Sequence, residues 1–151
     1  MFLDRIPYGL AARLKEKGFT SEGNTFYART ESRPTRKTRG WKMEEYTRTT
    51  LVTCEEPPRD SSTILERSYR DTTYTAAPTY AEVFDWLNRK AGIAVITYRM
   101  TQFWRTALRS ADNGTLIQDI RGDVTDPSRS WNENADEAIG LALEFLPPAV
   151  G

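Results

Sequence analysis

Apolar residues recur every three or four positions in three segments of the chain, and each segment predicts an amphipathic helix. The first helix is expected over residues 6–17, with Ile6 and Leu14 on its apolar stripe. Gly18 suits the left-handed cap that ends many helices, and Phe19 can then fold back onto the helix.

The second helix has the clearest start. Thr79 and Glu82 form a capping box, in which each side chain satisfies a backbone N–H at the helix N-terminus. Gly92 is expected to end the helix. The apolar residues at helical spacing, which we expect to pack in the core, are Tyr80, Val83, Phe84, Trp86 and Leu87.

The third helix is expected over residues 134–146, with Asn134 as N-cap and Pro147-Pro148 as its stop. This places Asp136 and Glu137 in the first turn, where the helix dipole favours acidic side chains.

Alternating residues over 93–100, 101–111 and 115–124 predict three antiparallel strands. A three-residue loop, Asp112-Asn113-Gly114, is expected to join the last two strands with Gly114 left-handed. This parity places on one face Trp104, Leu108, Leu116 and Ile120. It places on the other face Arg105, Arg109, Asp119 and Arg121.

Residues 24–74 are rich in Thr and Arg, with β-favouring pieces at 25–30, 41–53 and 63–69. We therefore predict a single α+β domain over residues 1–151. Its antiparallel sheet has helices packed on one face, in the order helix, β-rich insert, helix, three strands, helix.

Composition narrows the chemistry. The chain has no histidine, which excludes imidazole-based catalysis and most zinc or iron sites. Its 21 basic and 21 acidic residues cancel, so any anion site must be local. Cys54 alone cannot form an intramolecular disulfide, and no apolar run approaches the roughly 20 residues of a membrane span. We expect a cytoplasmic protein without a membrane segment.

Residues 29–42 form a basic segment, with six basic side chains against one acid, Glu31, and a local charge of +5. Arginine forks grip phosphates and aromatic rings stack on bases, so this segment is a candidate nucleotide site. The alternative is a solvated hairpin tip. The ligand-binding candidates, including the flanking Tyr27 and Trp41, are Tyr27, Arg29, Arg36, Lys37, Arg39 and Trp41.

The charged sheet face is the second candidate anion site, with Arg105, Arg109 and Arg121 as ligand-binding residues and Arg99 as a candidate addition. The alternative is internal pairing with Asp119 and Asp123.

Paired carboxylates occur at Glu44-Glu45, Glu55-Glu56 and Asp136-Glu137, but adjacent residues of a strand face opposite ways. We therefore expect no catalytic residue, no metal site and no cofactor.

Three pieces of the chain resemble a family of small proteins encoded by bacteriophages and mobile elements of Bacteroides-type gut bacteria. These pieces are IPYGLAARLKEKGF, PTYAEVFDWLNRKAGI and NADEAIGLALEFL. The resemblance implies a phage or prophage origin, and it carries over no catalytic residues.

These expectations favour a binding protein: a host-defence antagonist that sequesters a small anionic, nucleotide-derived signal in the cytoplasm of an infected bacterium. One alternative is a protein or nucleic-acid interaction module that uses the basic segment, and another is metal-dependent nucleotide cleavage by carboxylates. We also expect a homo-oligomer, with residues 146–150 packed on their own or a neighbouring subunit, because chain ends fray unless something holds them.

Overall fold

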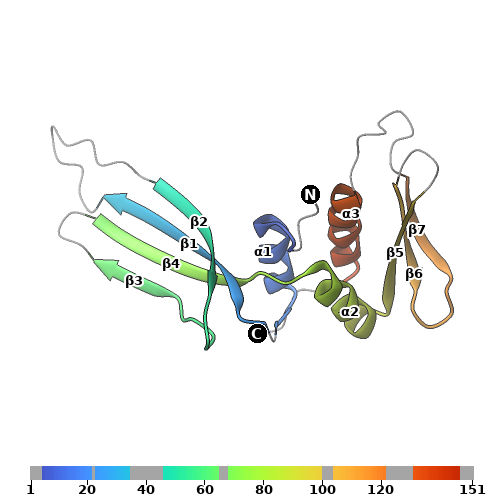
Figure 1. Cartoon of the computed structure of the whole chain (residues 1–151), viewed down its shortest axis with the longest axis horizontal. Helices are drawn as coiled ribbons and strands as arrows, with labels where there is room; N and C mark the ends of the chain where they lie inside the picture. The colour runs from blue at the N-terminus through green and yellow to red at the C-terminus, as the bar shows by residue number, and fades with distance from the viewer. Residues whose placement is uncertain are drawn as a thin grey trace. The chain divides into compact units, whose positions relative to one another are not determined.

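A computed structural model describes residues 5–21, 23–34, 46–64, 68–99, 104–121 and 131–146 of the chain. In chain order the elements are α1 (Tyr8–Glu16), β1 (Thr25–Pro34), β2 (Tyr46–Thr53), β3 (Ser61–Ile64), β4 (Ser68–Ala76), α2 (Tyr80–Ala91), β5 (Ile93–Arg99), β6 (Trp104–Ser110), β7 (Leu116–Arg121) and α3 (Trp131–Glu144) (Figure 1). Helices and antiparallel sheets in this order confirm the predicted α+β class.

The chain divides into two compact units. We call Met1–Thr20 with Pro78–Gly151 the helical unit, and Ser21–Ala77 the sheet unit. No helix in the described part of the chain is long and apolar enough to cross a membrane.

Helix α1 starts two residues later than predicted. Pro7 is its N-cap, and Ile6 lies outside the helix because the residue before a proline disfavours helical backbone. The predicted end is confirmed, since Gly18 is left-handed and the Phe19 N–H donates to the Leu14 carbonyl at 3.0 Å. Phe19 is buried edge-on against Trp86, with ring centroids 5.4 Å apart.

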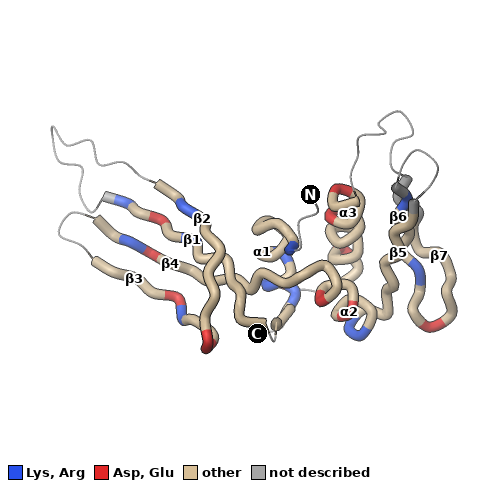
Figure 2. Tube along the Cα trace, viewed as in Figure 1, with Lys and Arg blue, Asp and Glu red and all other residues tan. Residues whose placement is uncertain are grey.

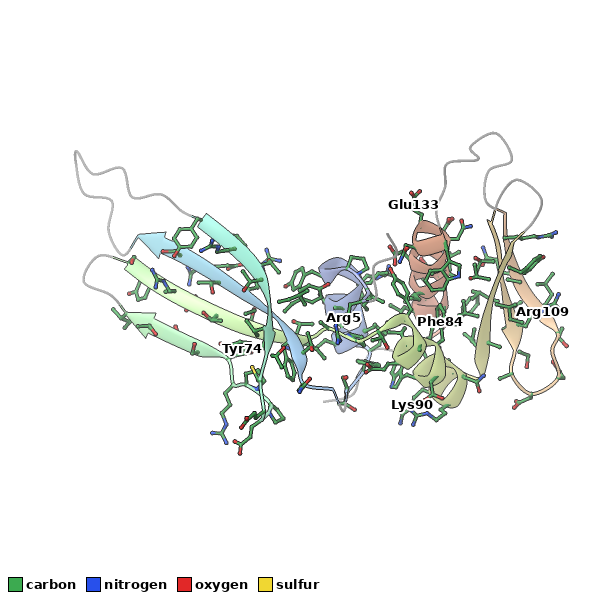
Figure 3. The ribbon with its side chains drawn as sticks, viewed as in Figure 1. Arg5, Tyr74, Phe84, Lys90, Arg109 and Glu133 are labelled. Atoms are coloured by element: carbon green, nitrogen blue, oxygen red, sulfur yellow. The ribbon has the colours of Figure 1, made fainter. Side chains whose placement is uncertain are left out.

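Helix α2 has both predicted ends, the Thr79–Glu82 capping box and a left-handed Gly92. The predicted core is buried at Tyr80, Val83, Trp86 and Leu87. Phe84, labelled in Figure 3, is only half-buried. Its ring lies 6.0 Å from that of Trp131, so Phe84 belongs to the rim of the core rather than its centre.

Helix α3 begins at Trp131, so the prediction of Asn134 as N-cap was wrong. Asn134 is fully buried inside the helix. The first turn of α3 carries Trp131, whose ring lies edge-on to that of Tyr80 with centroids 5.0 Å apart. Asp136 consequently lies beyond the first turn, and the dipole does not explain its position.

Strands β5, β6 and β7 form an antiparallel sheet in that order, as predicted. Helices α2 and α3 pack against β5, and α3 also contacts β6. Ile93 and Leu108 are buried on this side, while Ile96 and Tyr98 alternate with them and remain exposed. Helices therefore cover one sheet face, as expected.

The β6–β7 loop is one residue longer than predicted. The Ser110 N–H donates to the Thr115 carbonyl at 2.8 Å, which leaves four residues in the loop, with Gly114 left-handed as expected. A bulge next to Leu108 then restores the predicted register, Leu108 opposite Gln118 and Thr106 opposite Ile120. Leu116 pairs with Arg109 instead of joining the Leu108 face, so that placement was wrong.

The sheet unit is a four-stranded antiparallel sheet in the order β2-β1-β4-β3. The predicted strand at 63–69 was wrong, because β3 ends at Ile64 and β4 begins at Ser68. Strand β4 also continues to Ala76, beyond the β-favouring piece predicted at 63–69. No described helix belongs to this unit, and its buried hydrophobic residues among those described are Ala28 and Ala77.

Candidate functional site

Strand register divides the sheet unit into two chemically different faces. Thr30 lies opposite Arg48 on β2 and Thr72 on β4, and Ser32 lies opposite Tyr46 and Arg70. Directly opposed residues of antiparallel strands point to the same side. We call this side the Arg48 face. Its strand positions are Phe26, Ala28, Thr30, Ser32, Tyr46, Arg48, Thr50, Val52, Ser61, Thr63, Ser68, Arg70, Thr72, Tyr74 and Ala76.

An open hollow of about 660 Å³ lies on the Arg48 face. Its lining residues are Thr30, Tyr46, Thr47, Arg48, Arg70 and Thr72. Side-chain size accounts for the hollow: the central strand contributes the short Thr30 and Ser32, whereas the flanking strands contribute Tyr46, Arg48 and Arg70. Short side chains between long ones leave a depression with a hydroxyl floor and a cationic and aromatic rim.

The floor of the hollow is ordered by a hydrogen bond between the Thr30 and Thr72 hydroxyl oxygens, 3.1 Å apart. Arg48 and Arg70 stand at diagonal corners, two strands and two residues apart. Standard sheet dimensions put their Cα atoms about 12 Å from one another. Guanidinium groups at this spacing can hold two anionic groups, or converge on one.

The charged residues are spread along the strands of the sheet unit (Figure 2), and the strand register assigns them to the two faces. The strand positions of the Arg48 face include two arginines and no carboxylate. No ion pair within the described residues involves Arg48 or Arg70. Because these cations are not neutralised locally by described neighbours, the Arg48 face is suited to an anion.

The opposite side, which we call the Arg29 face, neutralises its own charge. Arg29 pairs with Glu31 at 3.4 Å, and Arg33 pairs with Asp71 at 3.0 Å. Asp71 also accepts a hydrogen bond from the Ser62 hydroxyl. Two of the six cations counted in the basic segment are therefore engaged by carboxylates, and the candidate Arg29 is one of them.

The sequence-predicted residues of the basic segment do not line the hollow where the structure describes them. Tyr27 and Arg29 lie on the Arg29 face, because their register partners Leu51 and Thr49 alternate with Arg48. The remaining four candidates lie outside the described residues; they are Arg36, Lys37, Arg39 and Trp41.

In the helical unit, the strand register brings the residues of the second predicted anion site to neighbouring positions on β6 and β7. Arg105 lies opposite Arg121, and Asp119 lies opposite Ala107. Ala107 separates Arg105 from Arg109 along β6. Arg109, labelled in Figure 3, donates to the Gly114 carbonyl at 3.0 Å and so ties its own hairpin. The side chain of Arg121 is outside the described set. Arg99 pairs with Trp104 in the strand register, and its side chain, like that of Asp119, is also outside the described set.

Sequence reasoning missed Arg48 and Arg70, which lay in the Thr-rich stretch with the weakest pattern. A signal was available in the alternation of Tyr46, Arg48 and Thr50. The side on which Arg48 faces, however, depends on its pairing with Thr30 of β1, which is 18 residues away in sequence.

The described residues contain no group of three or more Cys, Asp or Glu residues placed to hold a metal ion. Comparison of the chain with models of protein families, with curated proteins and with solved structures finds no match. The chemistry of the site therefore rests on its own geometry.

Proposed function

We propose that this protein is a non-catalytic binding protein that captures a small anionic, nucleotide-derived ligand on the Arg48 face. The observation that carries the proposal is the hollow rimmed by Arg48, Arg70 and Tyr46, on a face without a carboxylate at its strand positions. The proposed ligand is of the anionic class expected from the sequence. The proposed binding site, however, is the hollow on the Arg48 face and not the basic segment.

Each part of the rim suits one part of such a ligand. Guanidinium forks donate paired hydrogen bonds to phosphate oxygens. Tyr46, which is 42% exposed as a residue, offers an aromatic ring on which a base can stack. Threonine hydroxyls on the floor can donate to phosphate oxygens, and they can donate to or accept from sugar hydroxyls.

The biological role in this proposal is antagonism of host defence. Two observations support this role. The chain resembles phage-encoded proteins, and the residues that line the hollow are suited to binding an anion. The protein would act in the cytoplasm of an infected bacterium by lowering the free concentration of a nucleotide-derived signal.

Replacing Arg48 and Arg70 together by Glu tests the proposal. Each charge-assisted contact to a phosphate contributes about 1.5–3 kcal/mol, so losing two should weaken binding by at least about a hundredfold. Both side chains are exposed, and the free energy of unfolding should change by about 0.5 kcal/mol or less. Native mass spectrometry in a nucleotide mixture finds the ligand, and titration calorimetry measures the loss.

Two double variants with the same change of charge serve as matched controls: Arg36→Glu with Arg39→Glu, and Arg105→Glu with Arg109→Glu. Both should retain the ligand if the Arg48 face binds it. If all three fold and none alters nucleotide retention, anion capture is refuted and the interaction-module alternative replaces it. Binding that disappears steeply with added salt and extends to long polyanions also favours that alternative.

Capture and cleavage are separated by the state of the ligand. Mass spectrometry of ligand released by heat denaturation should recover it intact. Recovery of cleavage products instead would identify an enzyme and contradict the proposal.

A further inference from the structure

Strand β2 is an edge strand of the sheet unit and has the composition of a strand that pairs. In the order β2-β1-β4-β3 it occupies one end, and seven of its eight residues are exposed. Its sequence YTRTTLVT is rich in β-branched residues. It lacks the proline, lysine and bulge with which proteins commonly block edge pairing. The opposite edge, β3, is only four residues long.

The strand is also complementary to itself. Antiparallel pairing about a two-fold axis at Thr49 places Tyr46 opposite Val52 of a second copy and Arg48 opposite its Thr50. Aromatic with β-branched pairs are among the favourable cross-strand pairs, and this register avoids two arginines directly opposed. Pairing centred on Arg48 itself would oppose like charges. A second copy of this chain is therefore the partner that the edge fits.

We propose that β2 pairs with β2 of a second copy in this register, so that the two sheets continue as one and their hollows join across the two-fold axis. A two-fold axis perpendicular to the sheet keeps both Arg48 faces on the same side. The hollow already reaches the sheet edge, since its lining includes Thr47, whose register position belongs to the Arg29 face. In the pair, Thr50 and Val52 of the second copy extend the wall beside Arg48.

The charge of the joined face connects pairing to binding, and this step rests on the proposed function. The two Arg48 residues become diagonal neighbours about 7–8 Å apart, without a carboxylate at the strand positions of either Arg48 face. An anion between them removes their repulsion. The ligand class is therefore one that two symmetry-related arginines can share, either a ligand with anionic groups on both sides or one phosphate-bearing group at the axis.

Cysteine cross-linking tests the pairing register in the full chain. With Cys54→Ser removing the native thiol, Thr49→Cys places two thiols directly opposite each other at the axis, at a Cα separation that a disulfide can bridge. Thr47→Cys lies on the same face of the same strand, but its copies are separated by four residues of strand. Under mild oxidation, Thr49→Cys should give about tenfold more covalent dimer than Thr47→Cys.

Light scattering of the unaltered protein should show a dimer, and Thr63→Cys on β3 should cross-link no better than Thr47→Cys. Monomeric protein with no cross-link at Thr49→Cys overturns the proposal, and preferential cross-linking at Thr47→Cys or Thr63→Cys overturns its register. Native mass spectrometry with the nucleotide mixture separates the two hypotheses. Cross-linking at Thr49→Cys without nucleotide retention supports the dimer and overturns the proposed function, whereas nucleotide retention by a monomer overturns the dimer alone.

Discussion

Asp136 is a partly buried acidic residue of α3. Its Oδ1 accepts a hydrogen bond of 2.7 Å from the Tyr80 hydroxyl, and the Trp131 ring packs on Tyr80. Burial raises the pKa of the Asp136 carboxyl above its ordinary value, the charge of Glu133 adds to the rise, and the Tyr80 hydrogen bond opposes it. The folded state therefore holds the Asp136 proton more tightly than the unfolded chain does.

This difference predicts how stability changes with pH. Between the ordinary pKa of an aspartate and the raised pKa of Asp136, the folded state binds more protons, so its contribution to stability falls as pH rises. Asp136→Asn keeps an acceptor for Tyr80 without the charge. The variant should match the unaltered protein below this window and be more stable above it, as measured by thermal unfolding at several pH values.

Asp85→Asn is the control for that experiment, since Asp85 is exposed and pairs with Arg89 on the surface of α2 at 2.9 Å. Its effect should be small at every pH. An Asp136→Asn protein that is less stable than the unaltered one at neutral pH would show that the carboxylate contributes favourably there.

At the scale of the element, glycines at two kinds of position have opposite roles. Gly92 ends α2 at a φ of 64°, a left-handed conformation that side chains with a Cβ rarely adopt. Gly9 lies inside α1, and a Cβ built on it meets no atom within 4 Å. The backbone conformation requires a glycine at position 92. At position 9 it does not, and Gly9 only increases the conformational entropy that the unfolded chain loses on folding.

The two positions make a matched pair of substitutions. Gly92→Ala should destabilise the protein by about 1–2 kcal/mol through backbone strain alone, since its Cβ also meets no atom within 4 Å. Gly9→Ala should stabilise by about 0.5–1 kcal/mol. Denaturant unfolding measures both, and a neutral Gly92→Ala would mean that the helix end relaxes to another conformation.

At the scale of the whole molecule, the buried apolar side chains are unevenly distributed. Those that the structure describes belong to the helical unit except Ala28 and Ala77. In its described part, the sheet unit relies on backbone pairing and on polar contacts such as the Thr30–Thr72 hydrogen bond. Local stability follows buried apolar contact, so the two units should differ in their resistance to opening.

Amide hydrogen exchange should therefore be faster in β1–β4 than in α2, β5 and β6. Pairing of β2 with a second copy would slow exchange in β2 relative to β3, which provides an internal comparison. Equal protection throughout would instead support the single cooperative domain that the sequence analysis predicts.

The sequence alone determined the features of this protein that depend on neighbours within a few residues. The capping box at Thr79, the left-handed Gly18, Gly92 and Gly114, and the helical spacing that buries Leu87 were all predicted, because the atoms that decide them lie within one or two turns. The α+β class followed from the order of these local patterns.

Only the tertiary structure decided which side chains share a surface. Arg33 and Arg48 both carry positive charge, yet pairing of β1 with β4 gives Arg33 a carboxylate partner, Asp71, whereas pairing of β1 with β2 places Arg48 beside a hollow. A shift of one residue in that pairing would exchange the two faces. Likewise, α3 begins at Trp131 instead of at the predicted Asn134 cap. The Trp131 ring contacts Tyr80, which is about fifty positions away, and the local sequence pattern around Asn134 contains no trace of that contact.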